Sequence, residues 1–242
     1  MTLVNDIKPT GMDSAYVGGR PFDQAKKTLE GAGYNIITLE QNAGLRVSQG
    51  RAAIVSREGN YVAEGGLYLP DNHVLLVRNN PIMQSLEIAT NAHRNGKDFY
   101  PSPEQIEWAL SGEHVDLREG ERFIPVNAFT EDERTVFMFG KNTKAYADFL
   151  KENNFNEINI YLANSQDSAF VRQGWFYGLG VRSGVGVGDR GLDVGDRLRG
   201  VRGESTQAEI SVRTYTFADI SKALRDSNLG GIEAILSENL NR

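Results

Sequence analysis

Apolar residues recur at helical spacing in several stretches of this 242-residue chain. After Pro21, the side chains of Ala25 and Leu29 fall on one face, and the pattern stops at Gly31-Ala32-Gly33. Proline near the first turn and glycine past the last one are typical of a short helix. The same reasoning predicts three further helices, from Pro81 to Asn95, from Ser102 to Leu110 and from Asn142 to Leu150.

Short β-branched and aromatic runs predict the strands, at residues 34–39, 52–55, 61–63, 67–69, 73–77, 135–139 and 157–162. Turn-forming residues at 56–60 and 70–72 separate some of these runs and indicate hairpins. Because helices and strands do not alternate in long βαβ units, the pattern favours an α+β fold with short, mainly antiparallel strands and flanking helices. Residues 1–20 are expected to form an N-terminal arm, and residues 205–242 a closing strand and helices, at 208–212, 217–224 and 232–240.

Composition narrows the possible functions. The chain is 40% hydrophobic, with a net charge of −6, so it can bury a sizeable core and lacks the basic excess of a dedicated nucleic-acid-binding protein. It has no cysteine, which excludes disulfides and thiolate metal sites. The N-terminus has no apolar run typical of a signal peptide, and no stretch is apolar enough to span a membrane. We therefore expect a soluble chain of unknown location, whose display at a surface would need a partner or another export route.

A glycine-rich segment, residues 176–202, is the most unusual part of the chain. Ten of the 26 glycines lie between Gly174 and Gly203. Such a density raises the entropy lost on ordering the backbone, so the surroundings must hold the segment in place. Five apolar residues are spaced as anchors for it, namely Trp175, Leu179, Leu192, Leu198 and Val201. This spacing argues against the simpler interpretation, a flexible surface linker.

The glycine-rich segment also lacks five residue types: Lys, Gln, Glu, Met and Trp. They make up 40 of the 242 residues, so a 27-residue window would lack them all by chance roughly once in a hundred draws. None of the five has a codon ending in C, whereas every other amino acid has one. Random replacement of the adenines in AAC codons would produce this absence, because the C at the third codon position stays unchanged. The pattern indicates directed hypervariation, and therefore a ligand-binding surface rather than a catalytic site.

These features resemble the variable region of diversity-generating retroelement proteins, specifically the archaeal group. The resemblance rests on Trp175, the Gly/Asp/Val run and the sequence from Arg197 to Arg202. It implies a single C-type-lectin-like domain over residues 1–242, in which residues 171–202 form the variable ligand-binding region on a fixed scaffold. A reverse transcriptase would diversify that region. Unlike the bacterial and phage members, this chain continues for about forty residues beyond the region.

Candidate ligand contacts are the positions between the anchors that an AAC codon can reach by adenine replacement. They are Phe176, Tyr177, Val181, Gly184, Gly186, Val187, Asp189, Gly191, Asp193, Val194, Asp196 and Leu198. We expect Val187 and the aspartates to cluster on one exposed face, with Trp175 and Val201 buried. The resemblance implies, as the ligand, an unknown protein or carbohydrate on another cell or virus. No cofactor or metal is expected, because the calcium-binding triplets of sugar-binding lectins and EF-hand spacing are both missing.

Two other classes of function remain open. Gly186 to Gly191 matches G-x-G-x-x-G, so an enzyme or binding protein could use the loop for a phosphorylated ligand, although no helix is predicted after it. A structural surface or virion protein is the other alternative. The three histidines, His73, His93 and His114, show no metal-ligand spacing, and His93 is expected near a helix end, where a cation is favourable. The charged residues from Glu113 to Glu121 are interpreted as a solvated loop, so no catalytic residues are predicted.

Overall fold

A computed structural model describes residues 4–7, 13–180, 183–188, 191–193 and 195–202, with the side chains described from residue 14 onward. By its contacts the chain divides into two units, residues 1–204 and 205–242, and the second lies outside the described residues. The strand at 208–212 and the helices at 217–224 and 232–240 that the sequence predicts therefore fall there too. The fold is accordingly that of the first unit.

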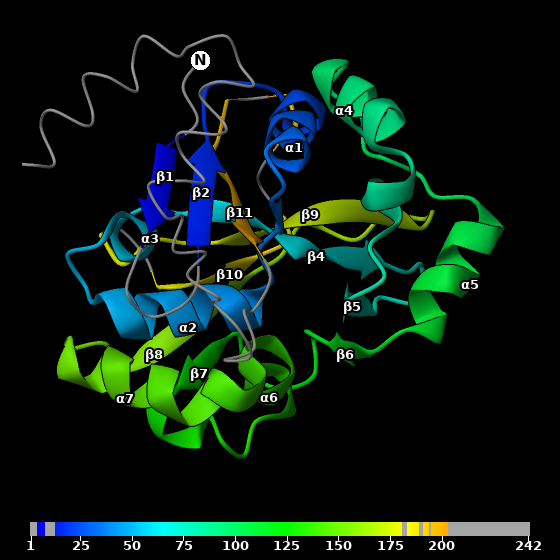
Figure 1. The fold of residues 1–242 in the computed structure, drawn as a ribbon. Coiled ribbons are helices and arrows are strands. Elements are labelled where there is room, and N and C mark those ends of the chain that lie inside the picture. Colours follow the sequence, from blue (N-terminus) through cyan, green and yellow to red (C-terminus); the bar gives the residue numbers. More distant parts are fainter. Residues whose placement is uncertain (1–3, 8–12, 181–182, 189–190, 194, 203–242) are drawn as a thin grey trace, which may run out of the picture. The chain divides into compact units, whose positions relative to one another are not determined.

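The strands of the described residues form one eleven-stranded sheet (Figure 1). They are β1 (Val4–Ile7), β2 (Asp13–Val17), β3 (Asn35–Ile36), β4 (Asn60–Tyr68), β5 (Val74–Val77), β6 (His114–Asp116), β7 (Phe123–Pro125), β8 (Glu157–Tyr161), β9 (Phe170–Phe176), β10 (Gly184–Gly186) and β11 (Leu198–Arg202). The main path through the sheet is β1-β2-β11-β4-β9-β10-β8-β7; β3 pairs with β11, β5 with β4, and β6 with β5. Only the β10–β8 and β11–β4 pairings are parallel among the described strands. The expected α+β, mainly antiparallel fold is confirmed.

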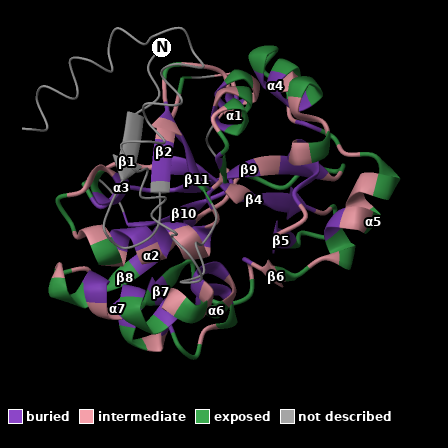
Figure 2. Ribbon diagram, in the orientation of Figure 1, coloured by how far each residue is buried: buried purple, intermediate pink, exposed green. Residues whose placement is uncertain are grey.

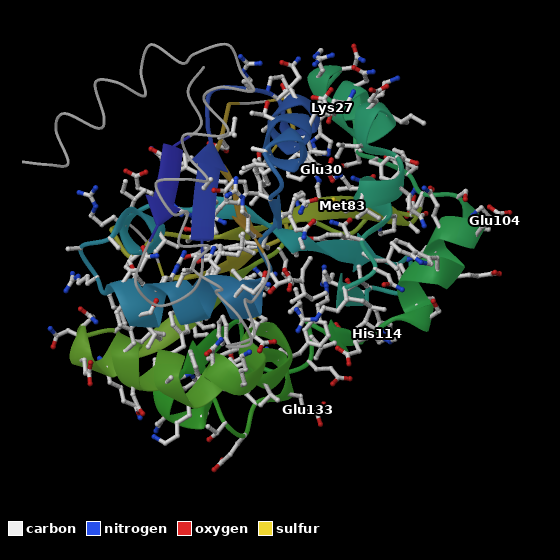
Figure 3. All side chains as sticks on the ribbon, viewed as in Figure 1. Lys27, Glu30, Met83, Glu104, His114 and Glu133 are labelled. Carbon is white, nitrogen blue, oxygen red and sulfur yellow. The ribbon has the colours of Figure 1, made fainter. Side chains whose placement is uncertain are left out.

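Helices cover both faces of the sheet (Figure 1). They are α1 (Phe22–Gly31), α2 (Leu39–Gln49), α3 (Ile54–Arg57), α4 (Leu86–Arg94), α5 (Pro103–Ser111), α6 (Glu133–Phe139) and α7 (Thr143–Glu152), with short 3-10 turns η1 (Pro81–Gln84), η2 (Val126–Ala128) and η3 (Gly140–Asn142). Helices α2, α6 and α7 pack on one face, and α1, α4 and α5 on the other, which gives two apolar cores. Charged side chains such as Glu104 and Glu133 point away from the sheet (Figure 3).

Alternation along the central strands divides side chains between the two cores. Tyr61 and Trp175 face the α1 side, whereas Val62 and Phe176 face the α2 side. The central strands are buried along most of their length (Figure 2). Both faces of β4 and β9 are therefore covered, so the segment that follows β9 starts from a strand packed on both sides.

Several local predictions are wrong. Residues 1–20 are not simply an arm, because β2 pairs with β11 and its Ala15 and Val17 are fully buried. Residues 34–39 contribute only a two-residue strand, and the chain then turns into α2. Residues 135–139 lie in helix α6, whose N-cap Asp132 accepts hydrogen bonds from the amides of Arg134 and Thr135.

The predicted helices at 22–33, 81–95, 102–110 and 142–150 are confirmed as α1, η1 with α4, α5 and α7. Residues 52–55 are predicted to be a strand, but α3 begins within them, at Ile54. The turn at 70–72 does join two strands, β4 and β5, as predicted.

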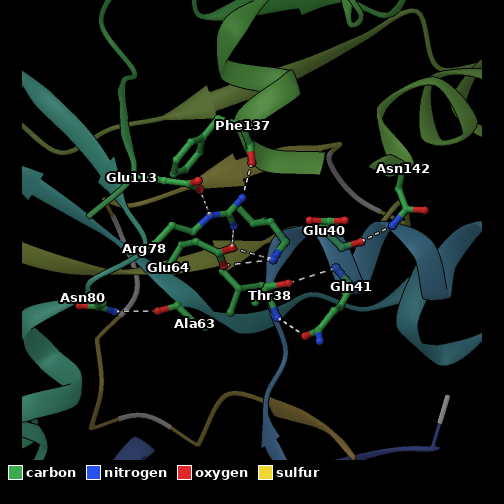
Figure 4. Close-up of polar contacts among 12 residues, drawn as sticks. Thr38, Glu40, Gln41, Ala63, Glu64, Arg78, Asn80, Glu113, Phe137 and Asn142 are labelled. Atoms are coloured by element: carbon green, nitrogen blue, oxygen red, sulfur yellow. Dashed lines mark hydrogen bonds and ion pairs between the residues drawn. The ribbon is translucent and has the colours of Figure 1, made fainter. Parts of the chain in front are cut away.

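At a bulge in β4, a side chain of the sheet forms hydrogen bonds with the start of helix α2 (Figure 4). The register of β4 against β9 shifts between Tyr61 and Gly65, which turns Glu64 away from the ladder. The Glu64 carboxylate accepts hydrogen bonds from the amide of Leu39, the first residue of α2, and pairs with Arg78. The Arg78 guanidinium also donates to the carbonyl of Phe137, 2.5 Å away. Burial raises the pKa of Glu64, so Arg78 is needed to compensate its charge.

Candidate functional site

The glycine-rich segment leaves the sheet after β9, returns as β10, leaves again and ends as β11. Backbone hydrogen bonds hold it at several points. The amide of Leu179 donates to Ser56 O at 2.7 Å, and that of Val187 to Tyr161 O at 2.9 Å. In the second loop, the amide of Phe22 donates to Leu192 O at 2.8 Å. These bonds fix the path of the described part of the segment irrespective of its side chains.

All five apolar anchors are buried, as predicted. The exposed fraction is 5% for Trp175 and Leu179, 2% for Val201 and zero for Leu192 and Leu198. The anchors divide between the two cores, so the segment is held from both faces of the sheet. The linker interpretation is therefore wrong for the described residues of the segment.

Two glycines show how closely the segment packs on the scaffold. A Cβ at Gly178 would lie 2.3 Å from the carbonyl oxygen of Arg57, and one at Gly184 would lie 2.2 Å from that of Asn159. Gly184 also has φ of 154°. Real Cβ atoms do not approach backbone so closely, so glycine at these positions permits backbone contact. This corrects the expectation that Gly184 is a ligand contact.

A buried arginine secures the first turn of the segment. Arg46 of α2 is fully buried, and its Nη1 donates to the carbonyl of Tyr177 at 2.9 Å and its Nη2 to that of Phe176 at 3.4 Å. Its Nε donates to Asn42 Oδ1 at 3.0 Å. Burial lowers the pKa of Arg46, so its retention in the core depends on these carbonyls and the aromatic ring beneath it. No local sequence pattern indicates this role of Arg46, because the two carbonyls lie 130 and 131 residues away along the chain.

Six candidate contact residues are buried rather than exposed. Phe176, Val187 and Leu198 are fully buried, Tyr177 is 6% exposed, and Gly184 and Gly186 form the ends of buried strand β10. The AAC-codon criterion took no account of pleating: in β9 and β11 successive residues face opposite sides, and here both sides are covered by helices. The expectation that these six residues lie on an exposed binding surface is therefore wrong.

The remaining described candidates, Gly191, Asp193 and Asp196, are half-buried in the loop between β10 and β11. Val181, Asp189 and Val194 lie outside the described residues. The expected cluster of Val187 with the aspartates on one exposed face is therefore wrong for Val187, and untested for Asp189. The described residues of this loop that reach the surface are Gly188, Gly191, Asp193, Gly195, Asp196 and Arg197.

A row of aromatic side chains lies along the sheet on the α1 side. Ring centres are 5.1 Å apart for Phe22 and Tyr61, 4.9 Å for Tyr61 and Trp175, 6.4 Å for Trp175 and Tyr177, and 4.7 Å for Tyr177 and Tyr161. The Tyr61 hydroxyl donates to Gly191 O at 2.6 Å, which connects the row to the second loop. Sequence reasoning missed this row, because its members come from four separate parts of the chain.

His93 lies in the last turn of α4, as the sequence predicts, but its surroundings disfavour the cation. Burial lowers its pKa, and the nearby charge of Arg172 lowers it further. His73 pairs with Asp116, which raises the pKa of His73. The described residues hold no group of three or more metal-ligating side chains, and none of their helices is long and apolar enough to cross a membrane. Nor does a helix follow the G-x-G-x-x-G motif among the described residues: residues 192–193 form a turn.

The sequence matches no protein-family model and no curated protein. The structure does resemble a solved one, which concerns the accommodation of massive sequence variation in Nanoarchaeota by the C-type lectin fold. The likeness covers 81% of this chain and 99% of that one, with a TM-score of 0.60 and 14% sequence identity. This chain has a C-type lectin fold. At that identity the likeness establishes the fold alone, and the function has to be argued from the residues of this chain.

Proposed function

We propose that this protein is a ligand-binding protein, without catalytic activity, whose loop between β10 and β11 presents diversified side chains on a C-type lectin scaffold. One observation supports this most directly: anchors and backbone hydrogen bonds hold the segment at both ends of that loop, while Asp193 and Asp196 reach the surface within it. A loop with a fixed path can accept different side chains at its exposed positions without losing its shape.

The proposed contact set is smaller than the sequence indicated. It keeps Gly191, Asp193 and Asp196 of the β10–β11 loop, and Asp189 and Val194 of the same loop, which lie outside the described residues. Val181, also outside the described residues, stays a proposed contact from the sequence between β9 and β10. The six buried candidates become framework, because a change there would disturb the core. The proposed ligand is a protein or carbohydrate on another cell or virus, and surface display through a partner belongs to the same proposal.

The gene offers the first test. If a retroelement diversifies the segment, codons at the proposed contact positions end in C more often than codons elsewhere in the gene. A near-identical repeat and a reverse transcriptase gene are expected nearby. Third positions that match the average of the gene, with no such repeat, would contradict the proposal of diversification.

Two matched libraries give the second test. One randomises Asp193 and Asp196 with NNC codons, and the other randomises the buried Val187 and Leu198 in the same way. We expect most members of the first library, and few of the second, to remain folded, as measured by resistance to proteolysis. Equal survival would contradict the assignment of contact and framework positions.

A further inference from the structure

A pocket lies beside the first turn of the glycine-rich segment, and no described residue of the β10–β11 loop lines it. Its volume is about 450 Å³, within the usual range for small-molecule sites. Its described lining consists of Arg51, Ala52, Arg57, Leu179 and Gly180. Three of the five precede β4, so most of the described lining comes from the scaffold rather than from the segment.

The walls of this arginine pocket are fixed by backbone contacts. The amide of Leu179 donates to Ser56 O at 2.7 Å, and the Ser56 hydroxyl donates to Gly50 O at 2.8 Å. A Cβ at Gly180 would lie 3.1 Å from the Arg57 carbonyl oxygen, so the two chain segments lie close together. The backbone that carries these lining residues is therefore held in a defined position.

The charge of the pocket is positive. Arg51 is held in place, since its Nη1 donates to Asn153 O at 3.3 Å and its Cζ lies 5.6 Å from the centre of the Phe155 ring. Arg57 is exposed, and its side chain has no hydrogen-bond or ion-pair partner in the described structure. The described lining includes no acidic residue. Two guanidinium groups beside the apolar side chains of Ala52 and Leu179 form a suitable site for an anion that carries an apolar group.

We propose that the arginine pocket binds the carboxylate or phosphate group of a small ligand, with Arg57 as the main contact and Leu179 against the apolar part of the ligand. Arg57 supplies up to five N–H donors in a planar arrangement that matches either anion. This site goes beyond the proposed function, because it requires neither diversification nor any side chain of the β10–β11 loop.

The experiment titrates the isotope-labelled full chain with three probes, observed by NMR: benzoate, inorganic phosphate and neutral benzamide. We expect benzoate or phosphate to cause saturable shifts at the amides of Leu179 and Gly180 and at the Arg57 side chain, whereas benzamide causes none at equal concentration. Higher salt weakens the binding. The stronger of the two anions identifies the ligand as a carboxylate or a phosphate.

The matched variants are Arg57→Gln in the pocket, at the end of α3, and Arg94→Gln in the last turn of α4. Helices α3 and α4 lie apart in the fold (Figure 1). Both arginines are exposed, so both variants are expected to fold. Arg57→Gln should weaken anion binding at least tenfold, and Arg94→Gln less than twofold. Shifts that benzamide reproduces, shifts that survive Arg57→Gln, or no response to either anion would each overturn the proposal.

Discussion

The guanidinium carbon of Arg46 lies 3.6 Å from the centre of the Phe176 ring, with both groups fully buried. The same guanidinium donates to the carbonyls of Phe176 and Tyr177, the first two residues of the glycine-rich segment. A cation at this depth is stable only when such partners replace its water. The pair therefore fixes the point at which the segment leaves β9.

Replacement of Arg46 with Met should destabilise the protein substantially. The variant fills similar volume but leaves the carbonyls of Phe176 and Tyr177 without their donor, and hydrogen bonds to a charged group contribute more than those between neutral groups. We expect a loss of about 3 kcal/mol in the free energy of unfolding, measured with denaturant. Arg94→Met, at an exposed site, is the control and should change it by less than about 0.5 kcal/mol. Equal effects of the two changes would argue against the role assigned to Arg46.

Position 187 should not tolerate a large side chain, although its codon class predicted that it would. Val187 is fully buried and packs against Gly66, where an added Cβ would lie 2.6 Å from the Cβ of Val187. Val187→Tyr overfills this space, and a loss of about 3 kcal/mol is expected from thermal or denaturant unfolding. Asp193→Asn, at a half-buried loop position, should alter stability by less than about 0.5 kcal/mol. A stable Val187→Tyr variant would restore Val187 as a surface position.

Two glycine-to-alanine substitutions should change the stability of the protein in opposite directions. At Gly178 the new methyl group would lie 2.3 Å from the Arg57 carbonyl, so the backbone must shift and stability should fall by about 2 kcal/mol. At Gly31, the last residue of α1, a Cβ meets nothing within 4 Å. Alanine there should stabilise the protein by about 0.5 kcal/mol, because it restricts the unfolded chain. The difference in melting temperature between the two variants checks both values, and a destabilised Gly31→Ala or a neutral Gly178→Ala would contradict them.

The contributions of His93 and His73 to stability should change with pH in opposite directions. The pKa of folded His93 lies below its unfolded value of about 6.5, so the unfolded chain binds more protons, and the stability that neutral His93 provides is lost as pH falls below that value. His93→Gln should therefore cost less stability at pH 5.5 than at pH 7.5. His73 has a raised pKa in the folded state because of its bond to Asp116, so its contribution is present at low pH and is lost as pH rises. His73→Gln should show the reverse trend in denaturant titrations at the two pH values, and parallel trends would contradict both assignments.

Local signals in the sequence predicted most helices and the class of fold, but the signals for the starts of α2 and α6 were misinterpreted. Thr38 and Gln41 form a capping box at the start of α2, and this T-x-x-Q pattern was present in the sequence. The β-branched residues before it favoured a strand instead. The same happened at α6, where Asp132 marks the helix start but the apolar run after it has strand propensity.

For the candidate site, the anchors could be predicted and the exposed positions could not. The anchors follow from apolar spacing, which is local. Whether Phe176 or Leu198 faces solvent depends on helices α1 and α2, which cover the two faces of the sheet and belong to distant parts of the chain. Buried Arg46 was unpredictable for the same reason. Sequence spacing therefore located the segment, whereas only tertiary packing distinguishes its exposed positions from its buried ones.

Strand β11 has a consequence for how the chain is made. It lies between β2 and β4, pairing residues 198–202 with residues 13–17, so nearly the whole first unit must be synthesised before the middle of the sheet can close. Such distant contacts form slowly, and until then β2 and β4 each have an unpaired edge open to aggregation. A substitution in the glycine-rich segment that prevents β11 from pairing would therefore block folding of the first unit, whatever its effect on the exposed positions of the segment.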